Sequence, residues 1–140
     1  MKKSFPFLFL IFSIFSFQSC SLDDDGVNFH YEALKITAAE VPDEFELYGV
    51  YDIKVTMVRP DDCTLIEGFD VTKSAVTTRN VVAIGTVLEK EECVENAQEV
   101  TQSFKFEVLY TNDYLFRFYT GDDADGDAQF IEVEVPVKGK

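Results

Sequence analysis

Several residue types are scarce in this 140-residue sequence, and each scarcity narrows what the chain can do. Trp is absent and His occurs once, as His30, so a Ser-His-Asp relay would have to include His30. No Gly-x-Ser-x-Gly nucleophile motif accompanies it, which argues against a hydrolase. Lys and Arg number 12 against 26 Asp and Glu, for a formal net charge of −14. Such an acidic surface repels phosphate backbones, so we expect no nucleic-acid binding, whereas divalent cations or a basic protein partner remain compatible.

A long transmembrane run is also missing, although the amino terminus is strongly apolar. Residues 5–17 form an almost unbroken apolar run after Lys2 and Lys3. This run is shorter than the roughly 20 residues that a membrane-spanning helix needs. A positive start, a short apolar run and the small residue Ser19 before Cys20 are typical of a secretory signal instead.

The order of an apolar run, the small residue Ser19 and Cys20 resembles the lipobox of bacterial lipoproteins, although Phe17 stands where Leu is common and Gln18 where a small residue is common. The resemblance implies cleavage before Cys20, diacylation of the Cys20 thiol and acylation of the new amino terminus. Each buried methylene contributes roughly 0.8 kcal/mol, so two or three chains would hold the protein at a membrane without a transmembrane helix. The alternative is an ordinary secretory signal that happens to precede a free cysteine.

An acidic tract follows Cys20 directly. Ser21 and Leu22 lead into Asp23, Asp24 and Asp25, and this cluster resembles the surface-export signal of Bacteroidetes lipoproteins. The resemblance implies a lipid anchor in the outer membrane with the domain on the outer, cell-surface face. The alternative is a solvated acidic spacer, because adjacent carboxylates repel each other and stay out of a core.

These features divide the chain into three parts. Residues 1–19 are predicted to be a signal peptide, residues 20–28 the lipidated cysteine with an acidic linker, and residues 29–140 one domain. Removing residues 1–19 from 140 leaves 121, which is enough for a single core. Losing Lys2 and Lys3 changes the formal charge from −14 to −16. Anionic membranes would repel that surface, so attachment is expected to come from the lipid.

Cys63 and Cys93 are the other two cysteines of the chain. The signal directs the chain to an oxidising compartment, where paired thiols become disulfides. A metal site would need more ligands than these two and the distant His30 supply. No Cys-x-x-Cys pair is present to exchange electrons. We therefore predict a structural disulfide, contributing roughly 3–4 kcal/mol by chain-entropy reasoning.

Alternation of apolar and polar residues with a period of two recurs along the domain and predicts strands. Expected strands cover residues 29–37, 51–57, 64–71, 79–88, 104–110, 114–118 and 131–137, with turns at 40–45, 60–62, 111–113 and 121–127. Residues 79–88 are apolar on both faces, which is typical of a central strand, and residues 111–113 look like a hairpin loop. Seven or eight short strands without a helical period predict an antiparallel β-sandwich. Within that class we favour an immunoglobulin-like topology, although the missing Trp removes one hallmark of antibody domains.

A second resemblance covers residues 51–137. It rests on Cys63, residues 79–83, residues 87–89, Cys93 and two aromatic segments, residues 104–106 and 114–121. Together they look like small surface lipoproteins of flavobacteria. The resemblance implies a surface-anchored β-domain with one disulfide, and it brings no catalytic or binding residue with it.

Residues 121–127 are the one stretch with metal-ligand character. Calcium takes six to eight hard oxygens, which the carboxylates of this loop could supply together with Asp61 and Asp62 if the fold joins the loops. On the EF-hand template Gly126 occupies the glycine position, but Gly121, without a side chain, occupies the first ligand position. Asp and Gly are equally favoured in a simple hairpin loop. The candidate calcium ligands are Asp122, Asp123, Asp125, Asp127 and, at the last template position, Glu132.

The aromatic segment near the carboxyl terminus supplies the remaining candidate site. Its members are Tyr110, Tyr114, Phe116, Phe118, Tyr119 and Phe130. A glycan-stacking platform is one interpretation, but alternation places most of the Phe residues on a buried face. Arg117 and Tyr119 fall on the opposite face and are the better candidates for an exposed recognition patch.

The sequence as a whole thus favours a lipid-anchored cell-surface protein whose β-sandwich is a non-enzymatic binding or structural module. Its expected partners are the membrane, through the lipid, and a protein or a glycan. The alternative is a calcium-dependent adhesion or ligand-binding module that uses the loop of residues 122–127. A small hydrolase ranks third.

Overall fold

The computed structural model describes residues 26–90 and 92–139, and every regular element within these ranges is a β-strand. The strands are β1 (Phe29–Leu34), β2 (Ile36–Glu40), β3 (Phe45–Glu46), β4 (Val50–Asp61), β5 (Thr64–Lys73), β6 (Thr78–Leu88), β7 (Glu95–Glu107), β8 (Tyr114–Asp122), β9 (Ala128–Val135) and β10 (Val137–Lys138). The predicted all-β class is confirmed. Their number exceeds the predicted seven or eight because the first predicted strand is divided in two, and because β3 and β10 are two-residue pieces.

The predictions for the amino terminus fall on residues 1–25. The signal peptide, the lipidation of Cys20 and the export signal of Asp23, Asp24 and Asp25 therefore lie outside the described residues. Within the described ranges, no helix is long and apolar enough to cross a bilayer.

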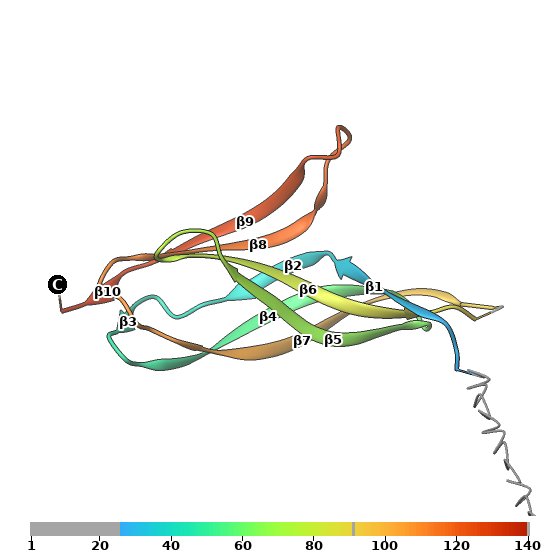
Figure 1. Ribbon diagram of the computed structural model, residues 1–140, viewed down its shortest axis with the longest axis horizontal. Coiled ribbons are helices and arrows are strands. Elements are labelled where there is room, and N and C mark those ends of the chain that lie inside the picture. The colour runs from blue at the N-terminus through green and yellow to red at the C-terminus, as the bar shows by residue number, and fades with distance from the viewer. Residues whose placement is uncertain (1–25, 91, 140) are drawn as a thin grey trace, which may run out of the picture.

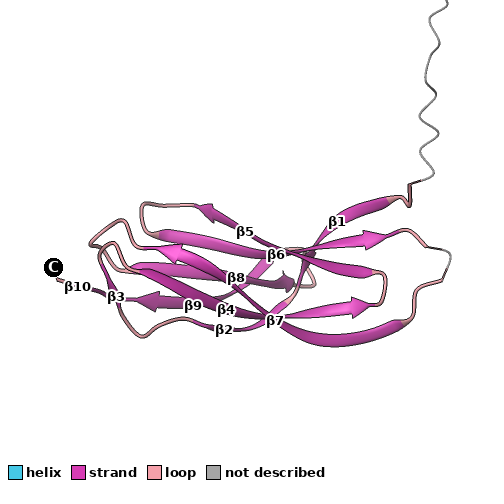
Figure 2. Cartoon of the chain, turned by 90° about the horizontal axis from the view of Figure 1, so that it is seen from below, coloured by secondary structure: helices cyan, strands magenta, loops and turns pink. Residues whose placement is uncertain are grey.

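The strands form two layers, as Figures 1 and 2 show. In the larger sheet β5 pairs along one edge of β6, while β1 and β8 share the other edge, and β9 pairs with β8. The second sheet has the order β2-β4-β7, and β3 and β10 form a short parallel pair. The predicted β-sandwich is confirmed. In an immunoglobulin constant-type domain both sheets are antiparallel. The topology here differs because β6 and β8 pair in parallel.

The first predicted strand, residues 29–37, is divided at Lys35. Leu34 ends β1 in the larger sheet and Ile36 begins β2 in the smaller sheet, and both side chains are buried. The Lys35 carbonyl accepts a hydrogen bond from the Val58 amide. The chain thus crosses from one layer to the other while it keeps apolar side chains in the core on both sides of the crossing.

Aromatic side chains from both layers fill the end of the core nearest β3. Phe45, Tyr114 and Phe116 are fully buried, and Phe106 is nearly so. The Phe106 ring from the smaller sheet lies 4.9 Å from the Phe116 ring of the larger sheet, measured between centroids. Each fully buried side chain of this size contributes about 1.5–3 kcal/mol. This aromatic cluster is therefore a main source of adhesion between the layers.

The predicted hairpin at residues 111–113 is wrong. β7 belongs to the smaller sheet and β8 to the larger one, so residues 108–113 carry the chain between layers. The Tyr114 hydroxyl accepts hydrogen bonds from the amides of Leu109 and Tyr110, at 3.0 and 3.1 Å, and so holds the crossing. Alternation predicted the buried face of each strand correctly, but a buried face is compatible with either layer, and Phe106 of β7 meets Phe116 of β8 across the core from the opposite sheet.

The predicted strands at residues 64–71 and 79–88 are confirmed as β5 and β6, with β6 central in the larger sheet. In contrast, β7 begins at Glu95, well before the predicted start at residue 104. Residues 95–103 are mostly polar and exposed and lack apolar alternation, yet they pair with β4, with one register shift between Arg59 and Asp61. Backbone pairing with β4 extends this strand beyond what its side chains indicate.

Candidate functional site

The loop between β8 and β9 is the acidic stretch that the sequence singled out. In Figure 1 this hairpin projects away from the rest of the sandwich. Asp123 organises the loop: its Oδ1 accepts hydrogen bonds from the amides of Asp125 and Asp127, both at 3.0 Å, and its Oδ2 accepts one from Gln129 Nε2 at 2.7 Å. Gly126 has a φ of 86°, a conformation that favours glycine. The roles of Asp123 and Gly126 in the loop are thus explained by the hydrogen bonds and the backbone conformation of the turn.

The predicted calcium ligands are not gathered on one point. Asp122 Oδ1 accepts a hydrogen bond from the Tyr119 hydroxyl at 2.9 Å. Glu132, the last template position, lies in β9 and pairs with Arg117. Within residues 26–90 and 92–139, the one group of three or more potential ligand side chains that converge is Asp62, Cys63 and Cys93. The loop of residues 122–127 and the pair Asp61 and Asp62 therefore do not form a shared carboxylate cluster.

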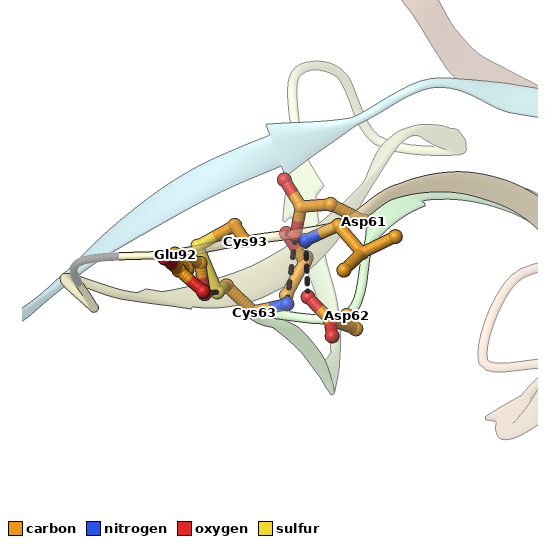
Figure 3. Close-up of a disulfide and its surroundings, with 7 residues drawn as sticks. Asp61, Asp62, Cys63, Glu92 and Cys93 are labelled. Atoms are coloured by element: carbon orange, nitrogen blue, oxygen red, sulfur yellow. Dashed lines mark hydrogen bonds between the residues drawn. A yellow bond between two sulfur atoms is a disulfide. The ribbon is translucent and has the colours of Figure 1, made fainter.

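The Cys63–Cys93 disulfide is present, as predicted, with Cα atoms 5.6 Å apart. It ties the turn after β4 to the segment after β6 (Figure 3). Asp61 Oδ1 accepts hydrogen bonds from the Cys63 amide and the Thr64 hydroxyl, and Asp62 Oδ1 accepts one from the Val94 amide (Figure 3). Because both sulfurs are bonded to each other, they offer no thiolate to a metal. Asp62 and the two cysteines therefore converge because the disulfide and the Asp62–Val94 hydrogen bond join the two segments.

Arg117 and Tyr119 lie side by side with Phe130 and Glu132 on the β8–β9 hairpin. Arg117 and Glu132 are opposite each other in register, and the Arg117 Nε donates to Glu132 Oε1 at 2.9 Å. The guanidinium lies 4.2 Å from the Phe130 ring centroid, and the Tyr119 ring meets Phe130 edge to face. Burial, followed by the hydrogen bond to Asp122 and its charge, raises the pKa of Tyr119. These four side chains form a half-exposed cation–π cluster, and the alternation of β8 and β9 about the 121–127 loop was the sequence signal for the pairing.

Tyr114, Phe116 and Phe118 are fully buried, as the alternation predicted for the core. They stack on the inner face of β8, with 6.0 Å between the ring centroids of Phe116 and Phe118. Tyr110 is partly exposed and its hydroxyl accepts a hydrogen bond from Lys73 Nζ. The aromatic row is therefore divided between the core and the surface.

His30 lies on exposed β1, where its Nδ1 is 3.6 Å from Glu89 Oε1. Both side chains are more than half exposed. The hollows of the described surface are shallow, and one of them lies along residues 26–29, just before His30. Two others lie at the β5 bulge beside Ile84 and beside Pro42. The lone histidine thus lies on the open surface beside an exposed carboxylate.

The sequence analysis missed one surface feature, the exposed aromatic pair Phe29 and Tyr31. All three of Tyr31, Leu34 and Ile36 lie in the strand predicted at residues 29–37, but Tyr31 is 66% exposed while Leu34 and Ile36 are buried. Odd spacing from Leu34 places Tyr31 on the other face of β1, a signal that the sequence did contain.

Comparison with protein families, with curated proteins and with solved structures finds no match to this chain.

Proposed function

We propose that this chain is a lipid-anchored cell-surface protein of the outer membrane whose β-sandwich is a non-enzymatic binding or structural module. Cys20 carries the lipid after removal of residues 1–19, and Asp23, Asp24 and Asp25 direct export to the outer face. In this proposal the chain is one of the flavobacterial surface lipoproteins that its sequence resembles.

The observation that carries the proposal is the position of β1. Because β1 begins at Phe29, residues 20–28 are the whole connection between Cys20 and the sandwich. The disulfide joins Cys63 to Cys93, and the buried core is built from residues between Leu34 and Val137. A lipidated Cys20 would therefore hold a finished, disulfide-stabilised domain on a short tether, which is the arrangement expected of a surface module.

A non-enzymatic role is supported by the way the reactive residue types are used. His30 pairs with Glu89 on the surface, and Asp123 holds the β8–β9 loop through three hydrogen bonds. Asp61 and Asp62 hold the turns at the disulfide. Each of these groups has a structural partner that accounts for it.

The partner is proposed to be a protein or a glycan, bound in addition to the membrane. The cluster of Arg117, Tyr119, Phe130 and Glu132 offers a ring, a cation and a hydroxyl on a projecting hairpin. Aromatic and Arg side chains are enriched where proteins bind partners. The formal charge of −14 disfavours nucleic acid.

Protease treatment of intact cells tests the proposed address. Wild-type protein should be degraded from outside, whereas a variant with Asp23, Asp24 and Asp25 replaced by Ala should be protected. A matched variant with Asp43, Asp125 and Asp127 replaced by Ala removes the same charge from exposed positions of the sandwich and should stay accessible. Equal accessibility of the two variants would contradict the export role, and a protected wild type would contradict the surface location.

A further inference from the structure

An apolar patch lies on the outer face of the larger sheet, at the end where the described chain begins. Phe29 is 54%, Tyr31 66% and Leu65 47% exposed. Tyr31 and Leu65 both pair with Thr86 of β6, one from each side, so the three side chains share one face. Phe29 packs edge to face on Tyr31, with ring centroids 5.7 Å apart. We call Phe29, Tyr31 and Leu65 the amino-terminal patch.

The patch is adjacent to the proposed tether. Phe29 pairs with Leu88, whose amide bonds the Cys63 carbonyl, so the patch lies at the disulfide end of the sandwich. The described chain begins at this end, with residues 26–28 leading directly into β1. The segment of residues 20–28 spans at most about 30 Å when fully extended. A lipid on Cys20 would therefore keep this end of the sandwich close to the bilayer surface.

The chemistry of the patch suits a bilayer interface better than bulk water. Tyr and other amphipathic aromatic side chains favour the level of the lipid headgroups. The chain as a whole is acidic, with a formal charge of −14, so the patch alone would not draw the protein to an anionic surface. A tether supplies the high local concentration that a weak contact needs.

From this placement we infer that the amino-terminal patch is a membrane contact, in which Phe29, Tyr31 and Leu65 rest on the headgroup region beneath the tethered domain. The inference depends on the proposed function, because it assumes a lipid on Cys20. It goes further in assigning the domain an orientation, with the disulfide end toward the bilayer and the β3 end away from it.

The absence of Trp from the chain allows a direct test. Tyr31→Trp places a single fluorophore in the patch, and Tyr48→Trp places one at a site that is 71% exposed and follows β3, at the opposite end in Figure 1. The full chain is purified from membranes with its native amino terminus and reconstituted in phosphatidylcholine vesicles. We expect the emission of Tyr31→Trp to shift to shorter wavelength and to lose intensity when the acyl chains are brominated. The emission of Tyr48→Trp should change in neither respect.

Emission from Tyr31→Trp that ignores brominated chains, on protein that floats with the vesicles, would overturn the inference. A shift already present without vesicles, together with a doubled mass by light scattering, would assign the patch to a second copy and overturn it as well. If mass spectrometry finds an unmodified Cys20, the proposed anchor fails separately. In that case, coupling the Cys20 thiol to a maleimide lipid restores the tether, and the same fluorescence comparison still decides the contact.

Discussion

Tyr114 shows, at the scale of a single residue, how one side chain joins the two layers. Its ring is fully buried among Phe45, Phe106 and Phe116. Its hydroxyl accepts the two amide hydrogen bonds that hold the crossing after β7. Tyr114 thus stabilises the fold through its buried ring and through the two hydrogen bonds to its hydroxyl. A substitution that keeps the ring and removes the hydroxyl separates these two contributions.

Replacing Tyr114 by Phe retains the ring and removes the acceptor of two amides. We expect the free energy of unfolding to fall by about 1–2 kcal/mol, because the two N–H groups lose their partner. Urea denaturation measures the change. Tyr119→Phe is the matched control, since its hydroxyl donates to the exposed Asp122, and it should stay within about 0.5 kcal/mol of wild type. A neutral Tyr114→Phe would contradict the role assigned to the hydroxyl.

The Cys63–Cys93 disulfide contributes by restricting the unfolded chain. It links residues 30 positions apart, so replacing both cysteines by Ala should lower the free energy of unfolding by roughly 3–4 kcal/mol. Reduced wild-type protein, denatured in urea with a thiol reductant, is the control and should show a loss of similar size. A double variant as stable as the oxidised protein would contradict this expectation.

At the scale of the element, the β8–β9 hairpin is the most self-contained unit. It is built by its own loop bonds and by the Arg117–Phe130 stack, and it projects from the sandwich beyond its pairing with β6. That independence makes its loop accessible to substitution without disturbing the core. Two predictions address the loop.

Asp123→Ala removes the acceptor for two loop amides and for Gln129. We expect about 1 kcal/mol of destabilisation, with faster amide hydrogen exchange confined to β8 and β9, since such bonds in exposed turns contribute modestly. Asp125→Ala is the control. Among the described residues the Asp125 side chain makes no hydrogen bond, although its amide does. Equal exchange in the two variants would show that Asp123 does not organise the loop.

A calcium titration distinguishes a purely structural loop at residues 122–127 from the alternative of a calcium-dependent adhesion module. A carboxylate site that binds only the folded state would raise Tm in proportion to the logarithm of calcium concentration. Because the loop carboxylates do not converge, we expect Tm in millimolar calcium to match Tm in magnesium at equal ionic strength. A rise specific to calcium, abolished in Asp123→Ala, would favour the adhesion alternative.

Elements were predictable from sequence where alternation was strong, as in β4 and the β8–β9 hairpin, or where a short apolar run indicated a central strand, as in β6. The sheet to which each strand belongs was not, because alternation reports a buried face and not a partner. The loop at residues 111–113 illustrates this: it is short enough for a hairpin, yet it connects two layers. The disulfide pairing followed from counting Cys63 and Cys93, whereas the exposed Tyr31 was missed because its phase relative to Leu34 was not considered.

At the scale of the whole molecule, the domain is an acidic β-sandwich that the proposed lipid on Cys20 would hold at a membrane. The domain carries a disulfide, a layered aromatic core and a surface rich in carboxylates. Its formal charge of −14 disfavours binding to an anionic membrane through the protein surface. The lipid on Cys20 is therefore the claim on which localisation, orientation and partner access all depend.

Intact-mass and peptide mass spectrometry of the protein purified from membranes tests that claim most directly. We predict a mature chain that begins at Cys20 and carries two or three acyl chains on that residue, with Cys63 and Cys93 joined in the same molecule. Cys20→Ala should yield no lipidated species. A mature chain that begins at another residue, or one whose Cys20 thiol is unmodified, would contradict the account.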